Sequence, residues 1–213
     1  MASIEEITFD CSKMEQARTE QYEKCWFDHN TQTQITLHFF DKEPDIPCKL
    51  SDIESLRNSF RDGITQVGGG LIKLDLVQLD SVDGIESIFK VPQNPHGMTY
   101  ICALTLPFSR FSYVIKVVAA ESGITGLRDN AVLGVMLGEG KIQIEKNGQI
   151  SGWASDPYMP SWQARCLRNE SDDEKYDEQF PDHPLSRLRK IINQIKRTTT
   201  FANGVKSEPR FAK

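Results

Sequence analysis

Alternation of apolar and polar residues predicts a series of β-strands in the first 120 residues. In residues 31–40, TQTQITLHFF, apolar Ile35, Leu37 and Phe39 alternate with polar side chains, which is the period of a strand with one buried face. Further strands are predicted in residues 71–79, 85–91, 98–106 and 111–120. Since their connections are too short for crossover helices, we expect an antiparallel meander. The valine-rich residues 114–118 predict a last strand that is covered in part on both faces.

A period of three to four residues predicts helices elsewhere. In residues 51–64, Ser51 and Glu54 have the spacing of a capping box, and one face carries Ile53, Leu56, Phe60 and Ile64. A second helix is predicted within residues 122–137. A third begins at Pro184, with its apolar face formed by Leu185, Leu188, Ile191, Ile192 and Ile195. Asn147-Gly148 is the favoured turn of a small hairpin at 141–153, and residues 1–30 are compatible with either a short helix or a strand.

These elements predict an α+β fold, an antiparallel β-sheet with flanking helices and a C-terminal helical extension. We expect three parts. Residues 1–150 form the sheet domain, and residues 151–200 form a loop-rich extension whose helix packs back onto it. Residues 201–213 have the composition of a flexible tail.

Composition and charge narrow the class of protein. The chain has 213 residues, of which 38 % are hydrophobic, and its formal net charge is −5. This content is enough for a core, and the negative charge argues against a nucleic-acid or anionic-membrane binder. There is no apolar run near the roughly 18 residues of a membrane span. The start of the sequence lacks the basic and apolar pattern of a secretory signal, so we expect a cytoplasmic protein.

The five cysteines, Cys11, Cys25, Cys48, Cys102 and Cys166, are widely spaced and form no CxxC pair. We therefore expect reduced thiols rather than a disulfide framework or a zinc ribbon. No phosphate-binding loop, nucleophile elbow or HExxH motif occurs, and we expect no cofactor.

Residues 170–183 contain a run of acids that offers a candidate cation site. Its hard-cation ligand types are Asp172, Asp173, Asp177, Asp182 and His183. The run lacks the pattern of an EF-hand loop, so a solvated acidic segment is the better interpretation. We expect these acids to pair with the basic residues of the helix that follows, rather than to leave that helix free for nucleic acid.

Aromatic and basic residues suggest a surface for another protein, because such side chains are enriched at interfaces. The candidate partner-binding residues are Tyr100, Phe108, Arg110, Trp153, Tyr158 and Trp162. For Trp153, Tyr158 and Trp162, anchoring of the loop-rich extension onto the domain is the favoured role, and contact with a partner is the other.

The order of these segments resembles that of the Mog1/PsbP-like fold group, which includes the small bacterial DcrB-type (DUF1795) proteins. The similar stretches are ITLHFF, SDIESLRNSFRDGI, IKLDLVQLDSVDGIESIFKV and TYICALTLPFSRFSYVIKVVAAESG, within residues 30–137. The resemblance implies a binding or accessory role, since members of the group are mostly non-enzymatic, and it supplies no catalytic residues. The segment after about residue 140 departs from the compact members.

Together these observations favour a non-catalytic protein-binding module, an accessory, chaperone or immunity-type protein of a bacterium. An exposed sheet face or edge would contact the partner, with the aromatic-rich loop beside it. The alternative is a metal-dependent hydrolase that uses the acids of residues 172–183. The oligomeric state and the identity of the partner do not follow from the sequence.

Overall fold

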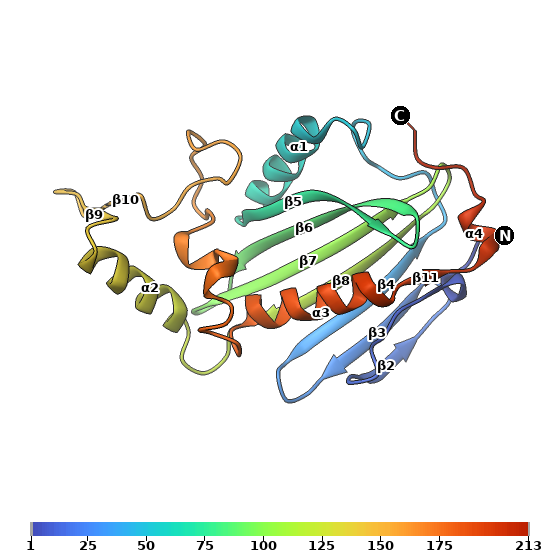
Figure 1. Ribbon diagram of the computed structural model, residues 1–213, viewed down its shortest axis with the longest axis horizontal. Coiled ribbons are helices and arrows are strands. Elements are labelled where there is room, and N and C mark those ends of the chain that lie inside the picture. Colours follow the sequence, from blue (N-terminus) through green and yellow to red (C-terminus); the bar gives the residue numbers. More distant parts are fainter. Residues whose placement is uncertain (1, 213) are drawn as a thin grey trace.

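The computed structural model describes residues 2–212, and its centre is one seven-stranded antiparallel sheet. The strand order is β2-β3-β4-β8-β7-β6-β5 (Figure 1). The strands span β2 Glu15–Thr19, β3 Glu23–Asp28, β4 Thr33–Phe40, β5 Gly70–Leu79, β6 Val82–Pro92, β7 Met98–Pro107 and β8 Ser112–Ala120. The predicted α+β class and antiparallel sheet are therefore confirmed.

One face of the sheet is covered by α3 (Pro184–Thr198), which packs on β7 and β8. The apolar face of α3 meets every second residue of these strands, because successive strand side chains point to opposite faces. Leu104 and Ile115 are completely buried there, as are Leu188 and Ile195 of the helix. The predicted amphipathic helix thus provides the main core of the molecule.

A second helix, α1 (Ile53–Gln66), covers the opposite face, but only at one edge. It packs on β5, and Leu56 and Ile64 form a separate apolar cluster with Leu74 and Ile85. Asp52 caps this helix through a bond from the Ser55 amide, so the predicted Ser51 cap lies one residue too early.

The segment after α3 is ordered against the body. Strand β1 (Ile7–Thr8), which follows the short helix η1 (Ile4–Glu6), pairs with β11 (Thr200–Phe201). Helix α4 (Asn203–Lys206) follows, and Val205 is 1 % exposed. The prediction that residues 201–213 form a flexible tail is therefore wrong for residues 201–212, because apolar side chains anchor this stretch.

An arm projects from the end of the sheet (Figure 1), formed by α2 (Leu127–Gly138) and the hairpin of β9 (Gln143–Ile144) and β10 (Ile150–Ser151). The returning chain contains the short helices η2 (Glu170–Asp172) and η3 (Glu174–Tyr176). No helix in residues 2–212 is long and apolar enough to cross a membrane.

Candidate functional site

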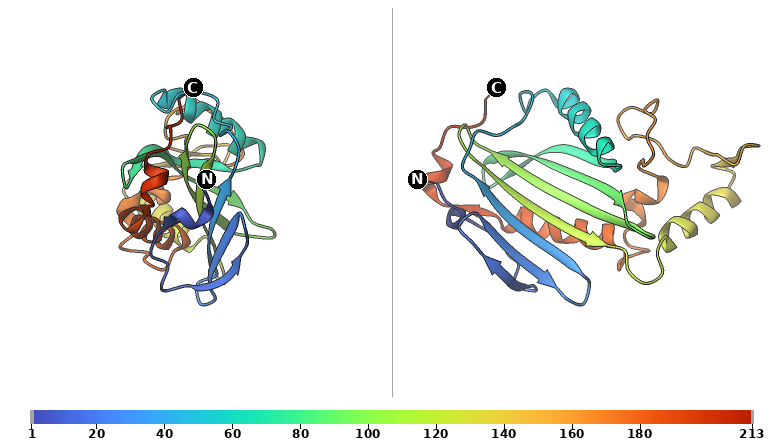
Figure 2. Two further views of the ribbon diagram at one scale, coloured as in Figure 1. Left: turned by 90° about the vertical axis from the view of Figure 1, so that its right-hand side faces the viewer. Right: turned by 180° about the vertical axis from the view of Figure 1, so that it is seen from behind.

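Most of one sheet face has no helix on it. Viewed from behind, strands β4, β8 and β7 lie uncovered, with α1 only at the far edge (Figure 2). The strand registers identify the side chains that point to this side. We call the central part of this set the open face, and it consists of Glu23, Cys25, Phe27, Gln34, Thr36, His38, Ile101, Ala103, Thr105, Val114, Lys116 and Val118.

Half of the open-face side chains are apolar, and most of the face is partly accessible to solvent. Val118 lies between Gln34 and Ile101 of the neighbouring strands, and Val114 lies between His38 and Thr105. All six of these side chains are half-buried, whereas the next residues on the same strands are buried on the α3 side of the sheet. The open face therefore has the character of a sheet surface that packs against another layer of structure.

Charge on the open face is sparse. Lys116 is exposed at its centre and is the one lysine or arginine in the set. His38 Nδ1 lies 3.3 Å from a carboxylate oxygen of Glu23, which favours the charged imidazole. Burial, together with the charges of Lys116 and Arg18, outweighs this attraction and lowers the pKa of His38. The imidazole is thus neutral near pH 7 and adds no charge to the open face.

A hollow of about 250 Å³ lies beside the open face. Thr105 and Val114 form its floor, Phe60 of α1 forms one wall, and the loop around Pro44 forms another. Phe40 also lines the hollow and is 37 % exposed. An apolar side chain from another molecule would find a depression here rather than a flat surface.

The predicted partner-binding residues do not form one surface. Tyr100 is 1 % exposed and Phe108 is 0 % exposed, because both point toward the α3 side and belong to the main core. Their assignment to a partner surface is therefore wrong. Arg110 is exposed in the turn between β7 and β8, away from the two buried rings. Alternation along the strand placed Tyr100 on a face, but it could not tell which face a helix covers.

The three aromatic residues of the 153–162 loop make anchoring contacts. The Tyr158 hydroxyl lies 2.7 Å from the Leu74 amide nitrogen at the edge of β5. The Trp162 ring lies 5.2 Å from the Arg61 guanidinium, and Arg61 in turn forms a buried ion pair with Asp156. Trp153 packs against the apolar side of α2. These contacts anchor the loop to α1, α2 and the edge of β5. That the same three aromatic residues also contact a partner stays a prediction.

The carboxylates of the acidic run pair with basic side chains from different parts of the chain. Asp172 is buried and pairs with Lys90 at 2.6 Å, and Asp177 accepts bonds from Arg128 and Arg189. Asp173 lies 3.2 Å from Arg168. In residues 2–212, no three His, Cys, Asp or Glu side chains are grouped so that they could hold a metal ion.

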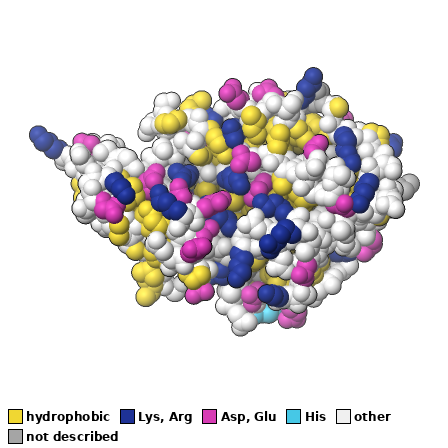
Figure 3. Space-filling model, in the orientation of Figure 1, with side chains coloured by type: hydrophobic (Ala, Val, Ile, Leu, Met, Phe, Trp, Pro, Cys, Tyr) yellow, Lys and Arg dark blue, Asp and Glu magenta, His cyan; other side chains and the backbone are white. Residues whose placement is uncertain are grey.

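The remaining residues of that candidate site point elsewhere. Asp182 is exposed, and His183 faces Glu121 with Nε2 3.7 Å from the carboxylate. The expected pairing of the acidic run with the basic helix is confirmed by the contacts of Arg189 with Asp177 and Glu174. Figure 3 shows the consequence on the α3 side, where basic and acidic side chains are interspersed.

Comparison with known proteins leaves the family open. No protein-family model matches the chain, and no characterised protein matches its sequence. A solved structure from Bacteroides thetaiotaomicron is similar over 58 % of this chain and 41 % of its own, with 7 % identity and a TM-score of 0.37. A Pseudomonas aeruginosa protein of unknown function is similar over 59 % of this chain and 81 % of its own, with 10 % identity and a TM-score of 0.36. The chain thus spans less than half of the first of these proteins.

Sequence reasoning expected an exposed sheet face but could not name its residues, because they follow from the strand order. The alternation of Val114, Lys116 and Val118 with buried residues was a usable signal, since a single lysine among valines suits a surface better than a core. The burial of this strand agrees with the predicted partial cover on both faces, because Ile115 and Val117 are buried on one side and Val114 and Val118 are half-buried on the other.

Proposed function

We propose that the protein is a non-catalytic protein-binding module and that the open face is where its partner packs. The observation that carries the proposal is the uncovered apolar surface of β3, β4, β8 and β7. Contiguous apolar surface of this kind is characteristic of interaction sites, because its exposure to water is unfavourable.

The composition of the open face indicates what a partner would present. β-Branched and small side chains such as Val114, Val118 and Ala103 favour close apolar packing, and Lys116 favours a carboxylate nearby. The neighbouring hollow beside Phe40 and Phe60 would take one larger apolar side chain. We therefore expect a partner with a mainly apolar contact surface that carries an acid near its centre.

The sequence resemblance to the Mog1/PsbP-like fold group supports an accessory, chaperone or immunity-type role, since its members are mostly binding proteins. By the same resemblance we propose a bacterial protein, and its sequence features favour the cytoplasm. The proposal for the open face rests on its side chains and does not depend on this finer assignment.

A charge placed at the centre of the open face tests the proposal. Val118→Glu puts a carboxylate where a partner would have to desolvate it, so we expect at least a tenfold loss of partner recovery. The matched control is Val67→Glu, because Val67 is 70 % exposed and follows α1, away from the open face. Both variants should keep a melting temperature close to that of the native protein.

The measurement is quantitative mass spectrometry of proteins captured from the source cells by the native protein and by each variant. The partner is a protein that the native chain and Val67→Glu retain and that Val118→Glu loses. If every captured protein is retained equally by the two variants, the open face is not the binding surface. Chromatography of the pure protein separates a second copy of this chain from a different partner.

A further inference from the structure

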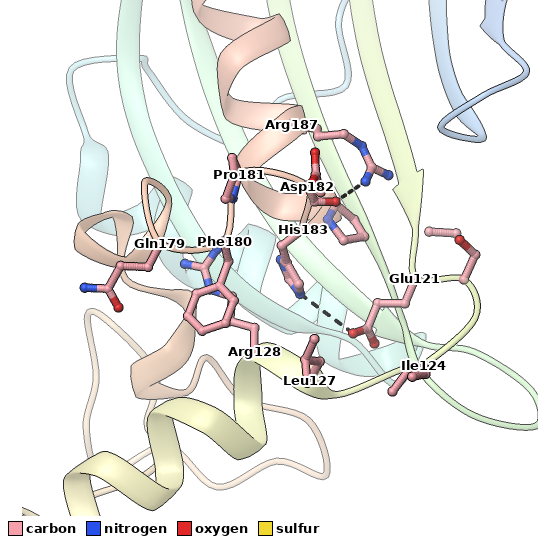
Figure 4. A pocket seen from close by; sticks show the side chains of 13 residues that line it. Glu121, Ile124, Leu127, Arg128, Gln179, Phe180, Pro181, Asp182, His183 and Arg187 are labelled. Carbon is pink, nitrogen blue, oxygen red and sulfur yellow. Dashed lines mark hydrogen bonds and ion pairs between the residues drawn. The ribbon is translucent and has the colours of Figure 1, made fainter.

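A cavity of about 330 Å³ lies at the root of the arm, separate from the open face (Figure 4). It is enclosed by the loop that follows β8, the start of α2, and the residues that lead into α3. Its volume is at the lower end of the range for small-molecule sites. Two buried polar side chains, Glu121 and His183, face each other in this cavity, and each is 8 % exposed.

Glu121 is held in place as a carboxylate. Its two oxygens accept hydrogen bonds from the Met98 and Gly126 amides, each at 2.9 Å. Burial acts to raise the pKa of Glu121, but the interaction with His183 and these two amides outweigh burial and lower it overall. The oxygen that faces His183 retains a free lone pair, because a carboxylate oxygen accepts more than one hydrogen bond.

His183 presents a donor to the same space. Its Nδ1 accepts a hydrogen bond from the Leu185 amide at 3.3 Å, which caps α3, so the neutral ring carries its proton on Nε2. This Nε2 is buried and has no hydrogen-bond partner within residues 2–212. Its distance of 3.7 Å from the Glu121 oxygen is too long for a direct hydrogen bond. A buried donor and a buried acceptor therefore stand side by side without satisfying each other.

The cavity also has apolar lining, beside the polar side chains of Gln179, Asp182 and Arg187 (Figure 4). Phe180 and Leu127 contribute to it, and Leu127 is 61 % exposed. Ile124 lies next to them and is 84 % exposed. A molecule with an apolar body would cover these side chains while its polar end reached the Glu121–His183 pair.

We propose that this cavity binds a small alcohol or phenol. One hydroxyl group would accept the proton of His183 Nε2 and donate its own proton to Glu121, which satisfies both buried groups. The apolar body would pack on Phe180, Leu127 and Ile124. A carboxylate ligand fits less well, because it has no proton to donate to Glu121, and an ammonium group could not accept the bond from His183.

Three ligands that share a benzyl group test, on the native chain, whether binding requires a hydroxyl group. Benzyl alcohol donates and accepts, benzyl methyl ether only accepts, and toluene does neither. Each is titrated into the full chain while the Gly126 and Leu185 amide signals are followed by NMR. We expect saturable shifts with the alcohol and about tenfold weaker binding of the ether and of toluene, since hydrogen bonds to charged groups contribute about 1.5–3 kcal/mol.

His183→Asn assigns the preference to the imidazole. Asparagine keeps the cap of α3 through its Oδ1, and its shorter side chain withdraws the Nε2 donor from the cavity. The alcohol then keeps only its bond to Glu121, so its preference over toluene should fall to about threefold. The matched control is His29→Asn, because His29 is 71 % exposed and distant in sequence from the cavity. This control should retain the full preference.

Equal binding of all three ligands would overturn the proposal and leave a purely apolar cavity. So would the absence of shifts at Gly126 and Leu185 up to the solubility of benzyl alcohol, or shifts confined to the open face. If His183→Asn does not fold, the comparison of the three ligands on the native chain still decides the question. This proposal is independent of partner binding by the open face.

Discussion

The two faces of the central sheet are built from the same strands but differ in how they are covered. On β8, Ile115 and Val117 lie under α3 and are fully buried, whereas their neighbours Val114 and Val118 on the other face stay half-exposed. One face is closed by a helix of the same chain, and the other is closed only at its edge by α1. An apolar sheet face needs a cover, so the difference indicates which side is available to another molecule.

The closed face also contains the charges that fix its cover in place. Lys90 on β6 pairs with Asp172, and Arg189 of α3 bonds to the carbonyl oxygen of Asp172. The open face has Lys116 at its centre and the Glu23–His38 pair nearer its edge. On this side of the sheet a buried ion pair, Arg61–Asp156, lies where α1 and the 153–162 loop supply both partners.

The largest expected effect comes from breaking the buried ion pair of the closed face. Lys90→Met fills a similar volume but leaves Asp172 buried without its cation, so we expect a loss of about 3–5 kcal/mol in the free energy of unfolding. Urea denaturation near pH 7 measures it. The control is Lys175→Met, which removes an exposed ion pair with Asp173 and should cost less than about 1 kcal/mol. Equal losses of unfolding free energy would show that burial does not decide how much each ion pair contributes to stability.

Two adjacent valines compare the faces directly. Val117→Ala removes methyl groups from the closed face and should cost about 2–3 kcal/mol, because transfer and cavity terms add. Val118→Ala on the open face should cost about 0.5 kcal/mol, since that side chain is already half in water. Denaturation midpoints of the two variants, measured side by side, test the contrast. A similar cost at both positions would mean that the open face is covered in solution.

A smaller effect is expected where the aromatic loop meets the sheet edge. Tyr158→Phe removes the hydroxyl oxygen that accepts the hydrogen bond of the Leu74 amide, so we expect a loss of about 1–2 kcal/mol and faster hydrogen exchange at Leu74. Tyr22→Phe is the control, because Tyr22 is 49 % exposed and its hydroxyl bonds only to Gln21 among the described residues. No change in Leu74 exchange would show that the loop does not protect this edge.

The smallest expected effect is the pH dependence of the stability that Glu121, just after β8, contributes. Since the folded pKa of Glu121 lies below its ordinary value, the carboxylate contributes stability that is present above the ordinary glutamate pKa of about 4.3. This contribution is lost as the pH falls through the lower, folded pKa. The difference in melting temperature between the native protein and Glu121→Gln should therefore be constant near neutrality and shrink in acid. A difference that grows on acidification would contradict the assignment.

Much of the fold follows from local patterns, and the exceptions have a common cause. The helices near Ile53 and Pro184 and the strands of the meander carry strong periodicity, because one face of each is buried. Strand β2, in contrast, is exposed along its whole length, so no alternation marks it in the sequence. Residues 200–206 show no periodic pattern, and they are held by the side chains of Phe201 and Val205, the pairing of β11 with β1 and the ion pair of Lys206 with Asp80.

The candidate sites were harder to predict because they depend on tertiary placement. Alternation shows that Val118 and Val117 point to opposite sides, but it does not show which side α3 occupies. Likewise, Glu121 and His183 lie in separate segments, and only the packing of α3 against β8 brings them together. The acidic run was visible in sequence, yet its members bind cations from β6, α2 and α3.

The late position of α3 in the chain has a consequence for biosynthesis. All seven strands of the central sheet are complete by Ala120, whereas the helix that seals their main apolar side begins only at Pro184. A ribosome therefore releases the strands before the helix that covers one of their faces, while the arm and the acidic segment are still being made. During that interval the nascent chain is most vulnerable to aggregation, and messages truncated before Pro184 should yield insoluble product.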